Sequence, residues 1–200
     1  MVRISGGNLC GRHLVTPEDR RVRPTGDRVR QAMFNMIQDR LAGCRVLDLF
    51  AGSGLLGIEA LSRGATLAIF VEREPDLVRL IHSNLEKCGL AARGRVIRAS
   101  ATQPQTYGAG EKLAAASRFD LVFMDPPYGK GLDVTVLREI VWPDILLPGA
   151  VVVVEHAAES EPLPECSGLR LWKQRRYGGT GVTLFQWDPP STTNPTECTR

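Results

Sequence analysis

The segment Val46–Gly57 decides the fold of this chain, and it has the sequence Val-Leu-Asp-Leu-Phe-Ala-Gly-Ser-Gly-Leu-Leu-Gly. Its first five residues, four of which are apolar, are typical of a buried strand. The small residues that follow allow the backbone to turn sharply and to approach a ligand closely. We expect a helix from Gly54 to Arg63, closed by Gly64. This order indicates a doubly wound sheet, in which ligands bind at the carboxyl ends of the strands.

The alternation of strands and helices continues along the chain. We expect further strands at residues 66–71, 95–98, 119–124 and 150–155, helices at 76–87 and 132–141, and a terminal antiparallel hairpin of residues 169–173 and 182–187. Alternating elements imply right-handed crossovers and a mostly parallel sheet that is covered on both faces. The sequence therefore predicts a Rossmann-like α/β fold.

Regions of different character flank this sheet. We expect a basic N-terminal hairpin and helix at residues 1–43, the sheet domain at 44–187, and a disordered tail rich in Pro, Thr and Ser at 188–200. Within the first region, residues 2–5 and 12–15 can pair as short strands. An amphipathic helix then extends from Asp27, its predicted N-cap, to Leu41.

Composition excludes several classes of protein. Apolar residues make up 43% and charged residues 24% of the 200 residues, which excludes wholesale disorder. The longest apolar runs are about five residues, far below the roughly 20 that a membrane span requires. The first residues lack the apolar stretch of a secretory signal, so we expect a cytoplasmic protein. The five cysteines form no Cys-x-x-Cys pair and the three histidines show no ligand spacing, so we expect no metal.

The positive charge is concentrated at the N-terminus. Residues 1–45 contain nine arginines and four acidic residues, a net charge of +5, whereas the remainder has a net charge of −2. Arginine suits bidentate contacts to phosphate better than lysine does. The alternative is a solvated basic arm without a partner. We expect contacts to nucleic-acid phosphates from Arg3, Arg12, Arg23, Arg28 and Arg30.

The glycine loop and an acidic residue beyond it predict a nucleoside cofactor. Glu72 lies twenty residues after Gly52, at the end of the second sheet strand, where a carboxylate can accept hydrogen bonds from both ribose hydroxyls. The pattern Gly52-x-Gly54-x-x-Gly57 also fits the dinucleotide fingerprint. However, Asp48 would repel a pyrophosphate and would attract a cationic amino-acid group. S-adenosylmethionine carries such a group and no phosphate, so the loop favours it over NAD.

The tetrad Asp125–Tyr128, Asp-Pro-Pro-Tyr, follows the fourth strand of the sheet and faces the same edge. The Asp125 carboxylate and the Pro126 carbonyl can hold the two hydrogens of an exocyclic amine and direct its lone pair at a methyl carbon. Pro127 restricts Pro126 and so fixes that carbonyl. Tyr128 can stack on the target base, which must be single-stranded or flipped. The sequence therefore predicts methylation of a base amine, with Asp125, Pro126 and Tyr128 as catalytic residues.

The chain resembles the RsmD family of bacterial 16S rRNA guanine-N2 methyltransferases over residues 1–187. The glycine loop and the tetrad are shared by many amino-methyltransferases, whereas the Arg-Pro-Thr-x-Asp-Arg segment and the long helix after the loop are more specific. The resemblance is carried by Arg3–Gly7, Arg23–Arg30, Phe34-Asn35, Leu47–Gly54, Gly57–Ala65 and Asp125–Tyr128.

This resemblance implies a class I S-adenosylmethionine-dependent methyltransferase that modifies one guanine of the small ribosomal subunit. It also implies that Thr25 approaches the cofactor from the N-terminal region. Such enzymes often carry an acidic residue near the adenine amine, where this chain offers Ser100 or the backbone at Ala101. We expect the guanine to contact Pro127 and Tyr128. We expect cofactor contacts from Thr25, Asp48, Ala51, Gly52, Ser53, Gly54, Glu72, Ser100, Ala101 and Asp125.

Three alternative functions share parts of this pattern. A DNA adenine-N6 methyltransferase needs the same tetrad, although a single domain leaves little room for a sequence-reading module. An NAD-dependent oxidoreductase explains the glycine loop but gives the tetrad no role. A non-catalytic RNA-binding assembly factor could retain the cofactor fold alone. For the favoured function we expect a monomer that acts on 16S rRNA in a preassembled small subunit.

Overall fold

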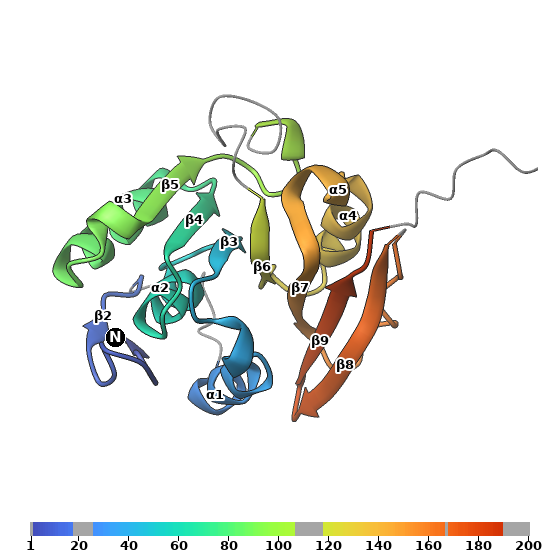
Figure 1. The fold of residues 1–200 in the computed structure, drawn as a ribbon, viewed down its shortest axis with the longest axis horizontal. Helices are drawn as coiled ribbons and strands as arrows, with labels where there is room; N and C mark the ends of the chain where they lie inside the picture. The colour runs from blue at the N-terminus through green and yellow to red at the C-terminus, as the bar shows by residue number, and fades with distance from the viewer. Residues whose placement is uncertain (1, 18–25, 107–117, 167, 190–200) are drawn as a thin grey trace, which may run out of the picture.

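A seven-stranded sheet forms the centre of the chain in the computed structural model, which describes residues 2–17, 26–106, 118–166 and 168–189 (Figure 1). The order of its strands is β5-β4-β3-β6-β7-β9-β8. The first five strands of this order run parallel, and β9 and β8 close the sheet as an antiparallel hairpin. The bounds are β3 Arg45–Leu49, β4 Leu67–Glu72, β5 Gly94–Arg98, β6 Phe119–Met124, β7 Leu146–Ala157, β8 Leu169–Tyr177 and β9 Thr180–Trp187.

Helices cover both faces of the sheet, because successive strand residues point to opposite sides. Leu121 and Phe123 of β6 share one buried cluster with α1, α2 and α3, whereas Val122 and Met124 share another with α4 and α5. The helix bounds are α1 Asp27–Met36, α2 Leu55–Ser62, α3 Pro75–Lys87, α4 Leu132–Glu139 and α5 Trp142–Ile145. Short 3-10 turns lie at η1 Gln38–Arg40, η2 Ala91–Arg93 and η3 Pro104–Thr106.

These elements confirm the predicted α/β fold with its mostly parallel sheet and terminal hairpin. The bounds differ in places. The predicted helix from Asp27 to Leu41 is divided, since α1 ends at Met36 and η1 follows. Asp27 is not the N-cap: Gly26 holds that position, and the Asp27 carboxylate instead pairs with Arg30 one turn on, at 2.9 Å. The four-residue helix α5 was not predicted from the sequence; its Pro143 fits the first turn of a helix, where no N–H partner is needed.

The N-terminal strands β1 (Val2–Arg3) and β2 (His13–Leu14) pair as predicted, and the turn between them docks on the end of α2. The Ser62 hydroxyl donates to the Gly6 carbonyl at 2.7 Å, and Asn8 N donates to the Ser62 carbonyl at 2.8 Å. Gly7 has φ +77°, and a Cβ there would lie 2.0 Å from the Ser62 carbonyl oxygen. Glycine is therefore required where the hairpin meets the helix.

The structure corrects the prediction that Arg30 contacts nucleic-acid phosphate, because this residue is fully buried. Its Nε forms an ion pair with Glu59 Oε2 of α2 at 2.7 Å, and its Nη2 donates to the Arg3 carbonyl at 2.6 Å. Glu59 also accepts hydrogen bonds from Arg63 Nη2, at 2.7 Å, and from the Ser5 hydroxyl. A buried charge must be paired in this way to offset its desolvation. We call Arg30, Glu59, Arg63 and Ser5 the buried ion network; it joins the N-terminal region to α1 and α2.

Within the described ranges, no helix combines the length and hydrophobicity needed to cross a bilayer. The same residues contain no group of three His, Cys, Asp or Glu side chains that could hold a metal ion.

Candidate active site

A cleft of about 1360 Å³ lies at the carboxyl ends of β3, β4, β5 and β6. The loops after these strands form its floor and walls, and the N-terminal hairpin borders it through Val2, Arg3 and His13. This is the edge at which a doubly wound sheet binds its ligands. The predicted site residues that line it together are Arg3, Asp48, Ala51, Gly52, Ser53, Glu72, Ser100, Ala101, Asp125, Pro126, Pro127 and Tyr128.

The glycine loop turns from β3 into α2 with an unusual backbone. Phe50 has φ +62°, a left-handed conformation that costs energy in a residue with a side chain and that is often retained at functional sites. Gly52 follows with φ +57°, and its N–H donates to Glu72 Oε2 at 2.9 Å. Gly54, with φ +81°, caps α2 and packs toward Ile81 rather than lining the cleft. Gly52 therefore lines the cleft where a cofactor contact was predicted, whereas Gly54 does not line the cleft.

Gly57 serves the packing of α2 on the sheet. A Cβ at this position would lie 2.3 Å from Cε1 of the Phe70 ring in β4. The Gly57 N–H also donates to Asp48 Oδ2 at 2.9 Å. The third glycine of the loop thus allows helix and strand to approach closely, as in dinucleotide-binding folds.

Asp48 places a carboxyl group at the floor of the cleft. It is 2% exposed, and burial raises the pKa of this carboxyl to about 7. The hydrogen bond from Gly57 opposes the rise in pKa, and the negative charge of Glu72 adds to it. A cation in the cleft would favour the charged carboxylate.

Glu72 is fixed at the end of β4 by backbone groups on two sides. Its Oε1 accepts hydrogen bonds from Arg73 N at 2.7 Å and Glu74 N at 2.9 Å, while its Oε2 accepts from Gly52 N. These bonds connect the end of β4 to the glycine loop and orient the carboxylate. Carboxylate oxygens have further lone pairs, so Glu72 can still accept hydrogen bonds from hydroxyl groups in the cleft.

The segment after β5 forms the opposite wall. Ser100 and Ala101 both line the cleft, and the Ser100 hydroxyl lies 2.8 Å from Thr102 Oγ1. Ala99 N donates to the Glu72 carbonyl at 3.0 Å, which holds this wall against β4. Polar groups are therefore available where an adenine ring would lie beyond a ribose bound to Glu72.

The tetrad extends the cleft beyond β6. Pro126 is buried, Asp125 and Tyr128 are half-buried, and Pro127 is exposed. The Tyr128 hydroxyl donates to Glu155 Oε1 at 2.9 Å and lies 3.4 Å from Thr180 Oγ1. Burial raises the pKa of Tyr128, so its hydroxyl remains protonated. The ring is consequently held at a fixed angle beside the cleft.

Sequence reasoning missed several residues that line the cleft, among them two charged residues close to the tetrad, Glu155 and Lys130. Glu155 is 5% exposed at the end of β7, and the available signal was an acid directly after an apolar strand. Lys130 is exposed, two residues after the tetrad. The carboxyl end of a parallel strand is where such residues meet a ligand.

The arginines predicted to contact phosphate differ in their position relative to the cleft. Arg3 lines the cleft, and Arg28 is exposed in the first turn of α1. Arg12 is exposed but lies away from the cleft, where its guanidinium donates to the Lys87 carbonyl at the end of α3. Arg23 and Thr25 lie outside the described residues, as does most of the predicted tail.

Comparison with known proteins identifies the family. The family described as "Conserved hypothetical protein 95" matches residues 2–186. The chain belongs to this family. YlbH of Bacillus subtilis is 37% identical over 92% of this chain and 98% of its own, and the "Ribosomal RNA small subunit methyltransferase D" of Haemophilus influenzae is 34% identical over 92% and 93%. The solved structure of yhhF from Escherichia coli has a TM-score of 0.77 at 31% identity and covers 94% of this chain and 98% of that one.

These similarities confirm the predicted resemblance to the RsmD family and the class I methyltransferase fold. The match to the family covers residues 2–186, a range that includes the sheet, the N-terminal hairpin and the buried ion network.

Proposed function

We propose that this member of the Conserved hypothetical protein 95 family transfers a methyl group from S-adenosylmethionine to the exocyclic N2 amine of a guanine in 16S rRNA. The observation that carries the proposal is that Asp48, Glu72 and the Asp-Pro-Pro-Tyr tetrad line one cleft. Three relatives that this chain matches over at least 89% of their length bear the name Ribosomal RNA small subunit methyltransferase D. Their name supports rRNA as the substrate class.

The residues at the floor of the cleft fit S-adenosylmethionine. Bound there, the cofactor supplies an electrophilic methyl group on a sulfonium. Glu72 would accept hydrogen bonds from the ribose hydroxyls, and Asp48 would face the positive end of the molecule. The backbone at Gly52 allows close approach because no Cβ intervenes. Ser100 and Ala101 would border the adenine.

The tetrad supplies the chemistry at the acceptor nitrogen. The amine of guanine is a weak nucleophile because its lone pair is delocalised into the ring. Asp125 and the Pro126 carbonyl would accept its two hydrogens and direct the lone pair at the methyl carbon, while Tyr128 stacks on the ring. As the N–C bond forms and the S–C bond breaks, the nitrogen becomes acidic, and its extra proton passes to Asp125 or water.

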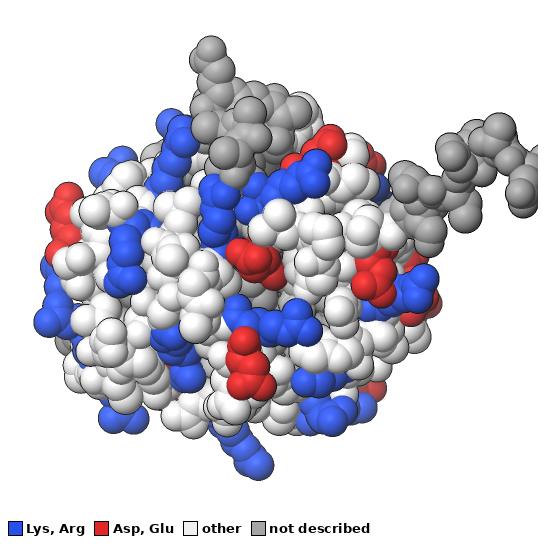
Figure 2. Space-filling view, viewed as in Figure 1, with Lys and Arg blue, Asp and Glu red and all other residues white. Residues whose placement is uncertain are grey.

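Basic residues around the cleft support binding of RNA. Arg3, Arg73 and Lys130 line the cleft together with acidic residues, and Arg28 is exposed next to Asp27, which also lines it. Figure 2 shows more basic than acidic side chains on the face viewed, with the two interspersed. Such a surface attracts phosphate without reading sequence. Because such contacts recognise the shape of the RNA rather than its sequence, we propose that the protein acts as a monomer on the assembled small subunit in the cytoplasm.

Transfer of labelled methyl from S-adenosylmethionine to unmethylated small subunits tests the proposal, with the nucleosides resolved afterwards. We expect the label in N2-methylguanosine, and we expect Asp125→Ala to abolish it while RNA affinity is retained. Label in N6-methyladenine from a parallel DNA incubation would replace this function with DNA methylation. Absence of label from both substrates would contradict the proposal and favour a non-catalytic RNA-binding factor. Equal activity on protein-free 16S rRNA would contradict the assembled subunit as the required substrate.

A further inference from the structure

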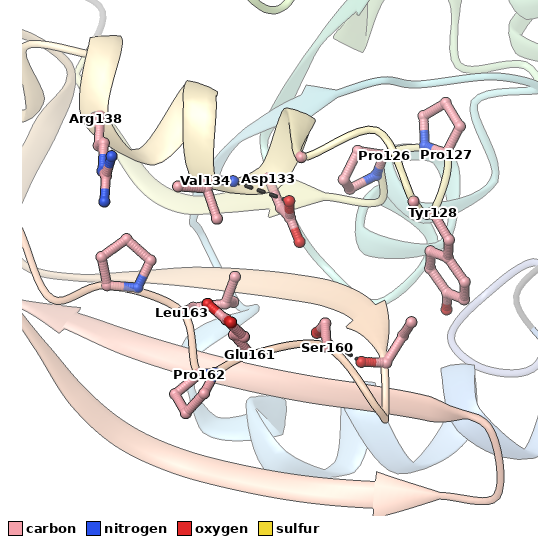
Figure 3. Close-up of a pocket in the computed structure, with 14 residues that line it drawn as sticks. Pro126, Pro127, Tyr128, Asp133, Val134, Arg138, Ser160, Glu161, Pro162 and Leu163 are labelled. Atoms are coloured by element: carbon pink, nitrogen blue, oxygen red, sulfur yellow. Dashed lines mark hydrogen bonds between the residues drawn. The ribbon is translucent and has the colours of Figure 1, made fainter.

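A second pocket lies on the other side of the tetrad from the cofactor end of the cleft. It has a volume of about 260 Å³ and is formed between α4 and the loop after β7 (Figure 3). Pro126, Pro127 and Tyr128 line both this pocket and the cleft. We call it the tetrad pocket; apart from the shared tetrad residues, its walls have no role in the proposed methyl transfer.

Prolines form much of the wall of the tetrad pocket and restrict its motion. Four prolines line it, Pro126 and Pro127 from the tetrad and Pro162 and Pro164 from the loop after β7. Proline has a fixed φ, so these surfaces lose little entropy when a ligand binds. The Ser160 hydroxyl donates to the Ala157 carbonyl at 2.7 Å, which stabilises the turn that begins the loop.

The charges in the tetrad pocket indicate what it can bind. Figure 3 shows Asp133 and Arg138 extending from α4 toward the loop that carries Ser160 and Glu161. Two carboxylates and one guanidinium give this lining a net negative charge, which disfavours a phosphate group. Carboxylates accept hydrogen bonds from base amines, and a guanidinium donates to base oxygens and nitrogens. Proline rings and other apolar groups beside both kinds of charged group suit a neutral nucleobase.

The tetrad pocket and the cleft share a wall, and this wall relates the base in one site to the base in the other. Because Pro126, Pro127 and Tyr128 line both sites, an RNA strand whose guanine stacks on Tyr128 in the cleft can continue past the two prolines. The next nucleotide along the strand then lies at the mouth of the tetrad pocket. We propose that the tetrad pocket binds the base of the nucleotide adjacent to the methylated guanine. This inference rests on the proposed function, since it takes the cleft as the site of the target base.

Photo-cross-linking tests the occupant of the pocket directly. Glu161 is exposed at the rim, so Glu161→p-benzoylphenylalanine would place a reactive group there without disturbing the core. The full-length variant is irradiated with unmethylated small subunits and S-adenosylhomocysteine, which holds the complex without turnover. Reverse transcription then maps the cross-link. We expect a stop at the nucleotide next to the guanine that wild-type enzyme labels. The same amino acid at Glu139, which is exposed on α4 outside the pocket, serves as the control.

Kinetics provide a second measurement. Glu161→Trp would place a ring in the pocket and compete with the base, so we expect the KM for subunits to rise about tenfold. The kcat at saturating subunits and the Kd for S-adenosylmethionine should remain those of the wild type, because neither the reacting atoms nor the cofactor end of the cleft changes. Glu139→Trp should leave all three constants unchanged.

The outcomes separate this inference from the proposed function. A cross-link only to a ribosomal protein or to remote nucleotides, no cross-link at all, or an unchanged KM in Glu161→Trp would overturn the inference even if guanine is methylated. Label in a different nucleoside of the subunit would contradict the guanine assignment, yet a cross-link next to that nucleotide would still support the pocket as a neighbour site.

Discussion

Asp48 shows how a single buried carboxyl can make cofactor binding depend on pH. Its pKa is about 7 because it is withdrawn from water, and a cationic ligand binds its charged form. Above pH 7 the carboxylate is charged before the ligand arrives, and binding requires no loss of a proton. Below pH 7 the proton must first leave, so the affinity falls as the pH falls.

We therefore expect the Kd for S-adenosylmethionine to be nearly constant above pH 7 and to rise by up to about tenfold per pH unit well below it. Calorimetric titration between pH 5.5 and 7.5 checks this expectation. Asp48→Asn should bind more weakly at pH 7.5 and should lose the pH dependence. Asp39→Asn, an exposed substitution far from the cleft, should reproduce the wild-type profile; a flat wild-type profile would contradict the role of Asp48.

Gly57 offers a test of packing at the scale of one methyl group. Gly57→Ala places a Cβ 2.3 Å from the Phe70 ring, and Phe70 is fully buried, so helix or ring must shift. Such overpacking costs about 1–3 kcal/mol of unfolding free energy. Urea denaturation measures the loss. Gly179→Ala is the matched control, because nothing lies within 4 Å of its added Cβ, and equal stability of the two variants would contradict this account.

At the scale of elements, α1 carries two arginines with different roles in its first turn. Arg30 is buried in the ion network, whereas Arg28 is exposed. Removing one partner of a buried ion pair leaves an uncompensated charge, so Arg30→Met should cost about 3–5 kcal/mol of unfolding free energy. Arg28→Met should leave unfolding unchanged within about 0.5 kcal/mol. Urea denaturation of the two variants measures the contrast, and a small effect of Arg30→Met would show that the network contributes little.

Arg28 and Arg30 also show what could not be predicted from the sequence. The sheet was predictable because apolar runs, glycines and acids recur at the spacing of a doubly wound fold, and β6 has the predicted bounds. The role of Arg30 was not predictable, since its partner Glu59 lies 29 residues away on another helix. A charge count gives the number of arginines but not the helix face that each occupies. Glu155 was missed for a similar reason, because its contact with Tyr128 depends on β6 and β7 being neighbours.

At the scale of the whole molecule, exposed arginines and lysines around the cleft should make RNA binding depend on salt. Each phosphate contact contributes about one unit to the slope of log K against log salt concentration. Arg28→Ala should therefore weaken binding to small subunits and reduce that slope by about one, without changing methylation at saturating subunits. Filter binding across a salt series measures the slope. Arg79→Ala, exposed on α3 and paired with Asp76, is the control; a slope unchanged by Arg28→Ala would exclude this residue from phosphate contact.

The docked N-terminal hairpin has a consequence for the order in which the protein is completed during synthesis. Ser5 bonds to Glu59, and the backbone of Val15 bonds to the Asn84 side chain, whose amide also reaches the Ser53 carbonyl. The hairpin is synthesised before α2 and α3, so its docking surface is incomplete until the chain has been translated past α3. The wall of the cleft that the hairpin forms is therefore assembled late, and a nascent chain that ends before α3 lacks this wall, whatever its local structure.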